Sequence, residues 1–152
     1  MDYKENPKEY HPRMHSAEHI LNGTMVKMFN RGRSFTQHIE KKKSKCDYHF
    51  ERDLTPAEIK NIEDTVNSAI NADIKVKEEF MNREEAGKYF NLERLPEDAG
   101  DNLRVIRIGD YDLCLCSGQH VDSTGEIGEF KIASTAFENN VLRIRFKIAE
   151  PK

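Results

Sequence analysis

Two short segments near opposite ends of the chain constrain its fold most strongly. In each of these steps, two residues with metal-binding side chains are four positions apart. The two steps are His15-Ser16-Ala17-Glu18-His19 and Cys116-Ser117-Gly118-Gln119-His120. Residues four apart on a helix lie on one face, so His15 and His19 can point at one spot. Cys116 and His120 can do the same if the chain turns tightly between them. Three imidazoles and a thiolate suit tetrahedral zinc, so a fold that joins the two ends would create a metal site.

Each step also has a simpler interpretation. A lone histidine pair is common on helices, and Cys116 could be a buried strand residue that shares a sheet face with Cys114. Gly118 argues against a regular strand because glycine lets backbone and ligands approach closely. A metalloprotease helix needs glutamate directly after the first histidine. Ser16 holds that position here, and we expect Glu18 to lie on another face of the helix.

Composition favours one globular domain. The chain has 152 residues, of which 37% are apolar and 34% charged, and this length can bury a core without disulfides. The net charge of -3 means that any RNA contact must come from a local basic patch. Three cysteines, an odd number, predict no disulfide framework and favour a cytoplasmic protein. The sequence shows no signal peptide and no apolar run long enough for a membrane helix.

The periodicity of apolar residues predicts an α+β fold with a mainly antiparallel sheet packed with helices. Residues 1–13 form a polar lead-in, and 14–152 form a single domain. Thr55-Pro56-Ala57-Glu58 is a typical helix start, with a capping threonine, proline in the first turn and glutamate at N3. We expect helices at 14–29, 55–72 and from 82, a loop at 92–101, and strands within 34–50, 74–77, 103–116, 127–134 and 141–148.

The motifs around the two steps resemble the editing domain, also called the second additional domain, of alanyl- and threonyl-tRNA synthetases. His15 to Leu21 is similar to its H-[ST]-A-x-H-[LI]-L start, and Cys116 to Val121 is similar to its C-x-G-x-H-V motif. The matching segments between and after them are Asp47-Tyr48-His49-Phe50, Ile62-Glu63-Asp64-Thr65-Val66-Asn67, Ser123-Thr124-Gly125-Glu126-Ile127-Gly128 and Leu142-Arg143-Ile144. The chain departs from the family at Gln119 and at Thr36-Gln37-His38-Ile39, which replaces a G-S-x-V segment.

This resemblance implies a free-standing editing factor of the AlaX type, because 152 residues leave no room for aminoacylation motifs. It implies that His15, His19, Cys116 and His120 hold Zn²⁺, either as a closed structural site or with one position open to water or substrate. The implied reaction is hydrolysis of mischarged tRNA, with Ser-tRNA(Ala) as the expected substrate and Gly-tRNA(Ala) as a second. The alternatives are Ser-tRNA(Thr) editing, a non-catalytic zinc-stabilised tRNA-binding module and a small zinc hydrolase for a free ester or amide.

Further residues are candidates for the pocket and for RNA contact. The catalytic base is not identified. The pocket candidates are Thr24, Thr36, Gln37, His38 and Gln119. The candidate tRNA-binding residues are Arg31, Arg33, Lys41, Lys42, Lys43, Arg143 and Arg145. Arg143 and Arg145 alternate with apolar residues, so we expect both to project from one sheet face, where they could contact phosphates.

Overall fold

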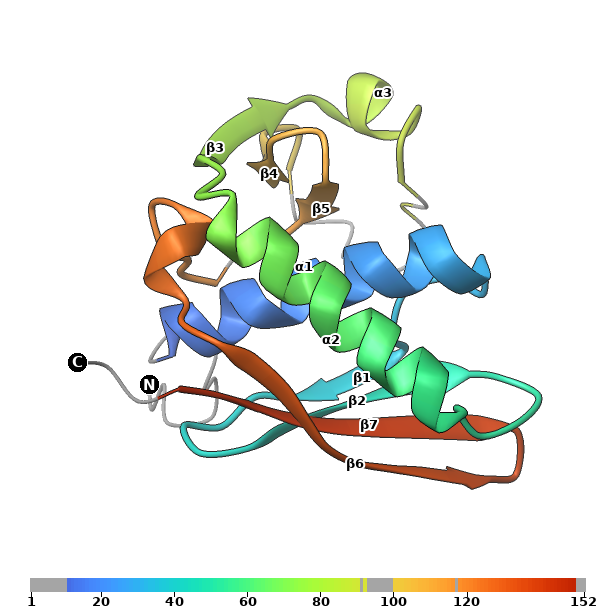
Figure 1. Ribbon diagram of the computed structural model, residues 1–152. Helices are drawn as coiled ribbons and strands as arrows, with labels where there is room; N and C mark the ends of the chain where they lie inside the picture. Colours follow the sequence, from blue (N-terminus) through green and yellow to red (C-terminus); the bar gives the residue numbers. More distant parts are fainter. Residues whose placement is uncertain (1–10, 91, 93–99, 117, 150–152) are drawn as a thin grey trace.

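The computed structural model describes residues 11–90, 92, 100–116 and 118–149. Its elements in chain order are α1 (Pro12–Phe29), β1 (Thr36–His38), β2 (Ser44–His49), α2 (Pro56–Asn71), β3 (Val76–Met81), α3 (Arg83–Ala86), β4 (Leu103–Ile108), β5 (Asp112–Leu115), the 3-10 helix η4 (Thr124–Glu126), β6 (Phe130–Glu138) and β7 (Val141–Ile148). All strand pairs are antiparallel. The predicted α+β class is confirmed, but the strands form two sheets, ordered β1-β2-β7-β6 and β3-β4-β5. Helices α1 and α2 lie on one face of the four-stranded sheet, with the three-stranded sheet beyond them (Figure 1).

Helix α1 is the central element of the fold. Pro12 stands in its first turn, where its missing N–H costs nothing, and Asn30 ends it in the left-handed conformation. The helix therefore begins two residues before the predicted start. Every residue from Met14 to Met25 is buried, because α1 contacts α2, β5 and β7. A helix buried on all sides is usually apolar. The polar side chains of this stretch are thus placed inside the protein, where they need partners.

The start of α2 follows the predicted capping pattern. Glu58 N–H donates to Thr55 Oγ1 at 3.1 Å, and Thr55 N–H donates to Glu58 Oε1 at 2.9 Å. Hydrogen bonds from Arg52 and from the Thr55 backbone lower the pKa of Glu58 to about 2. This capping box satisfies two helix N–H groups that have no partner within the helix.

The Thr55→Ala substitution is expected to destabilise the protein by about 1 kcal/mol, because the Glu58 N–H loses its side-chain acceptor. Urea unfolding followed by circular dichroism measures the difference. Thr65→Ala is the matched control, since Thr65 is exposed in the middle of the same helix. An equal loss of stability in both variants would show that the cap contributes nothing.

The strand predicted at 74–77 is displaced, and β3 starts at Val76. Ile74 and Lys75, the two residues before it, contact the loop that follows the Cys116–His120 segment. Ile74 N–H donates to Thr124 Oγ1 at 2.8 Å, and Lys75 forms an isolated bridge with Ser123. Thr124 Oγ1 also donates to Ala69 O at 2.8 Å, which fixes η4 against the end of α2. The prediction is confirmed at Val76 and Lys77 but not before them, because local alternation does not reveal a loop as the pairing partner.

The remaining strand predictions are confirmed in outline. The β4–β5 turn contains Gly109 at φ +50°, and a Cβ there would lie 2.6 Å from Ile74 Cγ2. The β6–β7 hairpin turns at Asn139 and Asn140, both with positive φ. Most of the predicted loop at 92–101 lies outside the described residues. All three cysteines are free thiols, and no described helix is long and apolar enough to cross a membrane.

Candidate metal centre

The structure brings the two sequence steps together. His15 and His19 lie one turn apart on α1, while Cys116 and His120 lie on the loop after β5. One ligand atom from each of the four residues lies within 4.8 Å of the other three. Cys116 Sγ is 3.3 Å from His15 Nε2 and 3.5 Å from His120 Nε2. The four side chains therefore converge on one point, although the second step is a loop and not a helical turn.

These separations fit a tetrahedral ion. Zn–N bonds of about 2.0–2.1 Å and a Zn–S bond of about 2.3 Å place tetrahedral nitrogen and sulfur ligands about 3.5–3.6 Å apart. The distance of 3.5 Å from Cys116 Sγ to His120 Nε2 matches this separation, and the 3.3 Å to His15 Nε2 is slightly shorter. The rings of His15 and His19 are nearly perpendicular, at 83°, so their nitrogens approach the centre from different directions.

The outer nitrogen of each imidazole faces a polar group. His15 Nδ1 lies 3.1 Å from Gln119 O, and His120 Nδ1 lies 2.9 Å from Ser16 Oγ. His19 Nδ1 lies 3.4 Å from Asp112 Oδ2, which is an ion-pair distance without a hydrogen bond. The hydrogen bonds at Nδ1 of His15 and His120 leave Nε2 of these two rings to face Cys116 Sγ, which is the arrangement that metal-binding histidines adopt. The donor atoms of these residues therefore suit a zinc ion, and so do the groups that face the outer nitrogens of the imidazoles.

Buried negative charge surrounds His19. Burial alone would lower its pKa, but Asp112, Cys116 and Glu18 raise the pKa of His19 to about 9. Burial would raise the pKa of Asp112, yet His19 and Arg33 together keep it below its ordinary value. Arg33 donates two hydrogen bonds to Asp112, from Nη1 to Oδ1 at 2.6 Å and from Nη2 to Oδ2 at 3.3 Å. The site therefore favours a positive charge at its centre, either a proton or a metal cation.

Backbone contacts fix the loop that carries Cys116 and His120. Arg104 Nη1 donates to Cys116 O and to Gly118 O, each at 2.8 Å. Val121 N–H donates to Ser16 Oγ at 3.1 Å, so the hydroxyl that supports His120 also joins the loop to α1. These contacts link the two ends of the sequence directly.

Comparison with known proteins gives a consistent result. Residues 103–144, which include Cys116 and His120, match the family model of the threonyl and alanyl tRNA synthetase second additional domain. The alanine–tRNA ligase of Coxiella burnetii (strain Dugway 5J108-111) is 36% identical over 125 residues, which is 80% of this chain and 14% of the ligase. That of Fervidobacterium nodosum is 37% identical over 134 residues, or 87% of this chain and 16% of the ligase. This chain is an editing-domain-like protein, similar to the second additional domain of threonyl and alanyl tRNA synthetases. It spans about a seventh of the length of these ligases.

The five pocket candidates of this editing-domain-like protein lie in different places. Thr24 is buried, with its hydroxyl bonded to Ile20 O and to Tyr111 Oη. Thr36 bonds Asp47 and His38 pairs with Glu40, both on the exposed side of β1. Gln37 Nε2 donates to Ser34 Oγ at 2.8 Å. The side chain of Gln119 is exposed, and its carbonyl oxygen supports His15.

The candidate tRNA-binding residues separate into two groups. Arg31 pairs with Glu51, Arg33 is committed to Asp112, and Arg143 forms two hydrogen bonds with Asp47. Lys41, Lys42, Lys43 and Arg145 instead line one depression, together with Lys45. The second group alone gathers several basic side chains at one place.

Glu18 is a site residue that the sequence interpretation placed incorrectly. We expected it on another face of α1, but its Oε1 lies 3.6 Å from His15 Nε2, and the residue is only 4% exposed. Positions i and i+3 are neighbours on a helix, so the spacing from His15 was the available signal. Asn22 Nδ2 donates to Glu18 Oε2 at 2.8 Å, and Ser34 N–H donates to Asn22 Oδ1 at 2.9 Å. This polar chain joins the cluster to the segment before β1.

Proposed function

We propose that this protein is a zinc-dependent deacylase that hydrolyses mischarged tRNA, with Ser-tRNA(Ala) as its main substrate. The observation that carries the proposal is the convergence of three oriented imidazoles and a thiolate, in a chain related to alanine–tRNA ligases. Four protein ligands would close the tetrahedron, so catalysis in this proposal requires one of them to be displaced by water or substrate. Zn²⁺ held there would then act as a Lewis acid, able to polarise an ester carbonyl and to lower the pKa of a coordinated water.

The surrounding residues have distinct roles in this proposal. Asp112, Ser16 and the Gln119 carbonyl orient the three imidazoles. Glu18 places a carboxylate beside the cluster, where it would attract the ammonium group of an aminoacyl ester. The buried side chains of α1 exclude bulk water, which strengthens these electrostatic interactions.

Discrimination between small amino acids needs polar contacts as well as size. One methyl group is worth about 1–3 kcal/mol of rejection, so charging errors between similar amino acids call for a second check. In this proposal, the Glu18–Asn22–Ser34–Gln37 chain supplies hydrogen-bonding groups for a serine hydroxyl. The family model covers threonyl as well as alanyl synthetases, so Ser-tRNA(Thr) is the second candidate substrate.

A deacylation panel tests the proposal. The purified protein is incubated with Ser-tRNA(Ala), Gly-tRNA(Ala), Ser-tRNA(Thr) and correctly charged Ala-tRNA(Ala), each carrying a radiolabelled amino acid. We expect the fastest release from Ser-tRNA(Ala) and release near the spontaneous rate from Ala-tRNA(Ala). Faster release from Ser-tRNA(Thr) would reassign the substrate, and tRNA binding without any deacylation would support the non-catalytic module instead.

A further inference from the structure

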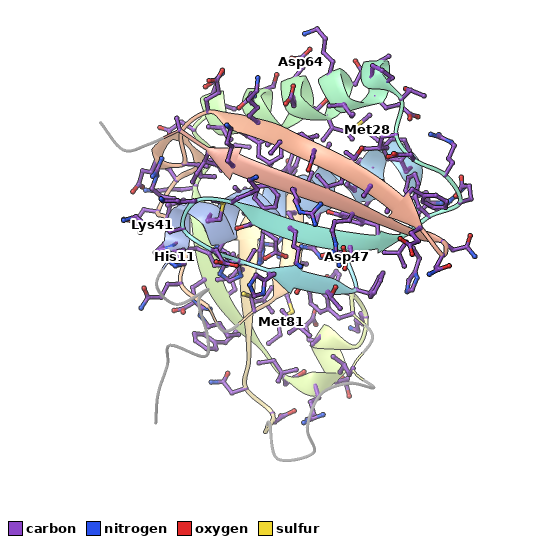
Figure 2. The ribbon with its side chains drawn as sticks, turned by 90° about the horizontal axis from the view of Figure 1, so that it is seen from below. His11, Met28, Lys41, Asp47, Asp64 and Met81 are labelled. Atoms are coloured by element: carbon purple, nitrogen blue, oxygen red, sulfur yellow. The ribbon has the colours of Figure 1, made fainter. Side chains whose placement is uncertain are left out.

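The outer face of the four-stranded sheet carries a row of basic side chains. On β7, Leu142, Ile144 and Phe146 are buried, whereas Arg143, Arg145 and Lys147 alternate with them. The helices cover the opposite face, so the three basic residues project away from the core (Figure 1). Figure 2 shows this sheet from below, with α1 behind the strands and α2 along the upper edge of the sheet. This open basic surface contrasts with the chain's net charge of -3.

Two pairs of like charges face each other across this sheet. Lys45 on β2 is opposite Arg145 on β7, and Lys131 on β6 is opposite Lys147 on β7. Like charges directly opposite in antiparallel strands destabilise the pairing. Among the described residues, no ion pair with a carboxylate neutralises any of these four side chains, whereas Arg143 is paired with Asp47. Stability does not account for this arrangement, but a polyanionic partner would.

The surface around Arg145 is also concave. One depression of about 510 Å³ is lined by Lys41, Lys42, Lys43, Lys45, Arg145 and His38, with Glu40 and Ser44. A second, of about 360 Å³, also borders Arg145 and includes Phe35, Ala136 and Arg143, together with the carboxylates of Asp47 and Glu138. Ser134 and Ala136 on the neighbouring strand β6 are exposed and small, so they leave room for a nucleic-acid backbone to approach the sheet closely. Arg145 and Lys147 are about 7 Å apart along the strand, close to the separation of successive phosphates in RNA.

The basic surface reaches the end of α1 that carries the first histidine. Lys41 shares a small depression with His11, Arg13 and Met14, and Met14 directly precedes His15. Figure 2 shows Lys41 and His11 at the same end of the sheet. A nucleic acid lying on the sheet could therefore extend past Lys41 towards the metal cluster.

We infer that the outer face of the four-stranded sheet, centred on Lys45 and Arg145, binds the phosphate backbone of the tRNA acceptor stem. The identity of the RNA in this inference rests on the proposed function. The choice of the surface rests on the charge and geometry of the sheet. Phosphate oxygens would relieve the repulsion between Lys45 and Arg145, so binding and sheet stability are coupled at this position.

Charge reversal at one member of the pair tests this coupling. Lys45→Glu would create a favourable cross-strand pair with Arg145 and remove a phosphate contact. We expect a higher urea midpoint but at least fivefold weaker binding of uncharged tRNA(Ala) by fluorescence anisotropy. The dependence of log K on log salt should become shallower by about one unit. Lys60→Glu is the control with the same charge change, since Lys60 is exposed on α2 and should leave tRNA affinity within twofold.

The outcomes separate this inference from the proposed function. If Lys45→Glu binds tRNA as tightly as the unchanged protein at low salt, the docking surface is wrong, whatever the deacylase activity. If Ser-tRNA(Ala) is not hydrolysed but Lys45→Glu still weakens tRNA binding, the docking surface stands and the proposed reaction fails. Where both hold, Lys45→Glu should raise KM for Ser-tRNA(Ala) and leave kcat unchanged, because the residue lies away from the metal cluster.

Discussion

Cys116→Ala is expected to lower zinc affinity by at least about 10²-fold and to abolish deacylation of Ser-tRNA(Ala). A complete four-ligand zinc site contributes about 10–16 kcal/mol, so one ligand is worth about 2.5–4 kcal/mol, which is about 10²- to 10³-fold in affinity. Cys116 also joins the two halves of the site, since its Sγ approaches both His15 and His120. Competition with a chromophoric chelator measures the affinity. Substitution with Co²⁺ should give a thiolate-to-metal absorption band that Cys116→Ala lacks.

Cys114→Ala is the matched control. Cys114 lies two residues earlier on β5, its Sγ bonds Leu115 O, and it is not among the four clustered residues. Burial raises the pKa of this thiol to about 11, so it is a poor thiolate donor. The variant should keep zinc affinity, the cobalt band and activity. If Cys114→Ala loses the cobalt band and Cys116→Ala keeps it, the assignment of the metal ligand is wrong.

Asp112→Asn should weaken zinc binding by about 10–100-fold without removing a ligand. The carboxylate faces His19 Nδ1 at 3.4 Å and accepts two hydrogen bonds from Arg33. The amide of asparagine is neutral, and its NH₂ group can face either His19 or Arg33. The substitution should therefore weaken both the orientation of His19 and the pairing with Arg33. Arg33 is partly exposed, which limits the accompanying loss of stability to about 1–3 kcal/mol.

The role of Asp112 is tested by metal affinity and by the Co²⁺ spectrum of the folded variant, because a merely structural role would lower stability without shifting that spectrum. We expect shifted d–d bands in Asp112→Asn with the thiolate band retained. Asp110→Asn, on the exposed turn two residues earlier, is the control and should match the unchanged protein in both measurements. Unaltered affinity in Asp112→Asn would show that the carboxylate does not position His19.

The sequence predicted features that depend on neighbours along the chain. The histidine pair on α1, the capping box at Thr55 and the β6–β7 hairpin follow from local spacing and turn residues. The convergence of the two steps required the family resemblance, because no local rule brings residue 15 next to residue 116.

Features set by tertiary packing were missed. Asp112 becomes a partner of His19 only because β5 packs against α1. Arg33 was a candidate for RNA contact, yet its guanidinium forms an ion pair with the buried carboxylate of Asp112. The like-charged pair of Lys45 and Arg145 depends on the register between β2 and β7, which the sequence does not specify.

The central claim is that the cluster of His15, His19, Cys116 and His120 binds zinc and that deacylation depends on it. Its most direct test is the rate of serine release from Ser-tRNA(Ala) by protein that is zinc-loaded, stripped by a chelator, and reloaded with one equivalent of zinc. The account predicts a fall to the spontaneous rate on stripping and recovery on reloading. Full activity of protein shown by elemental analysis to be metal-free would contradict it.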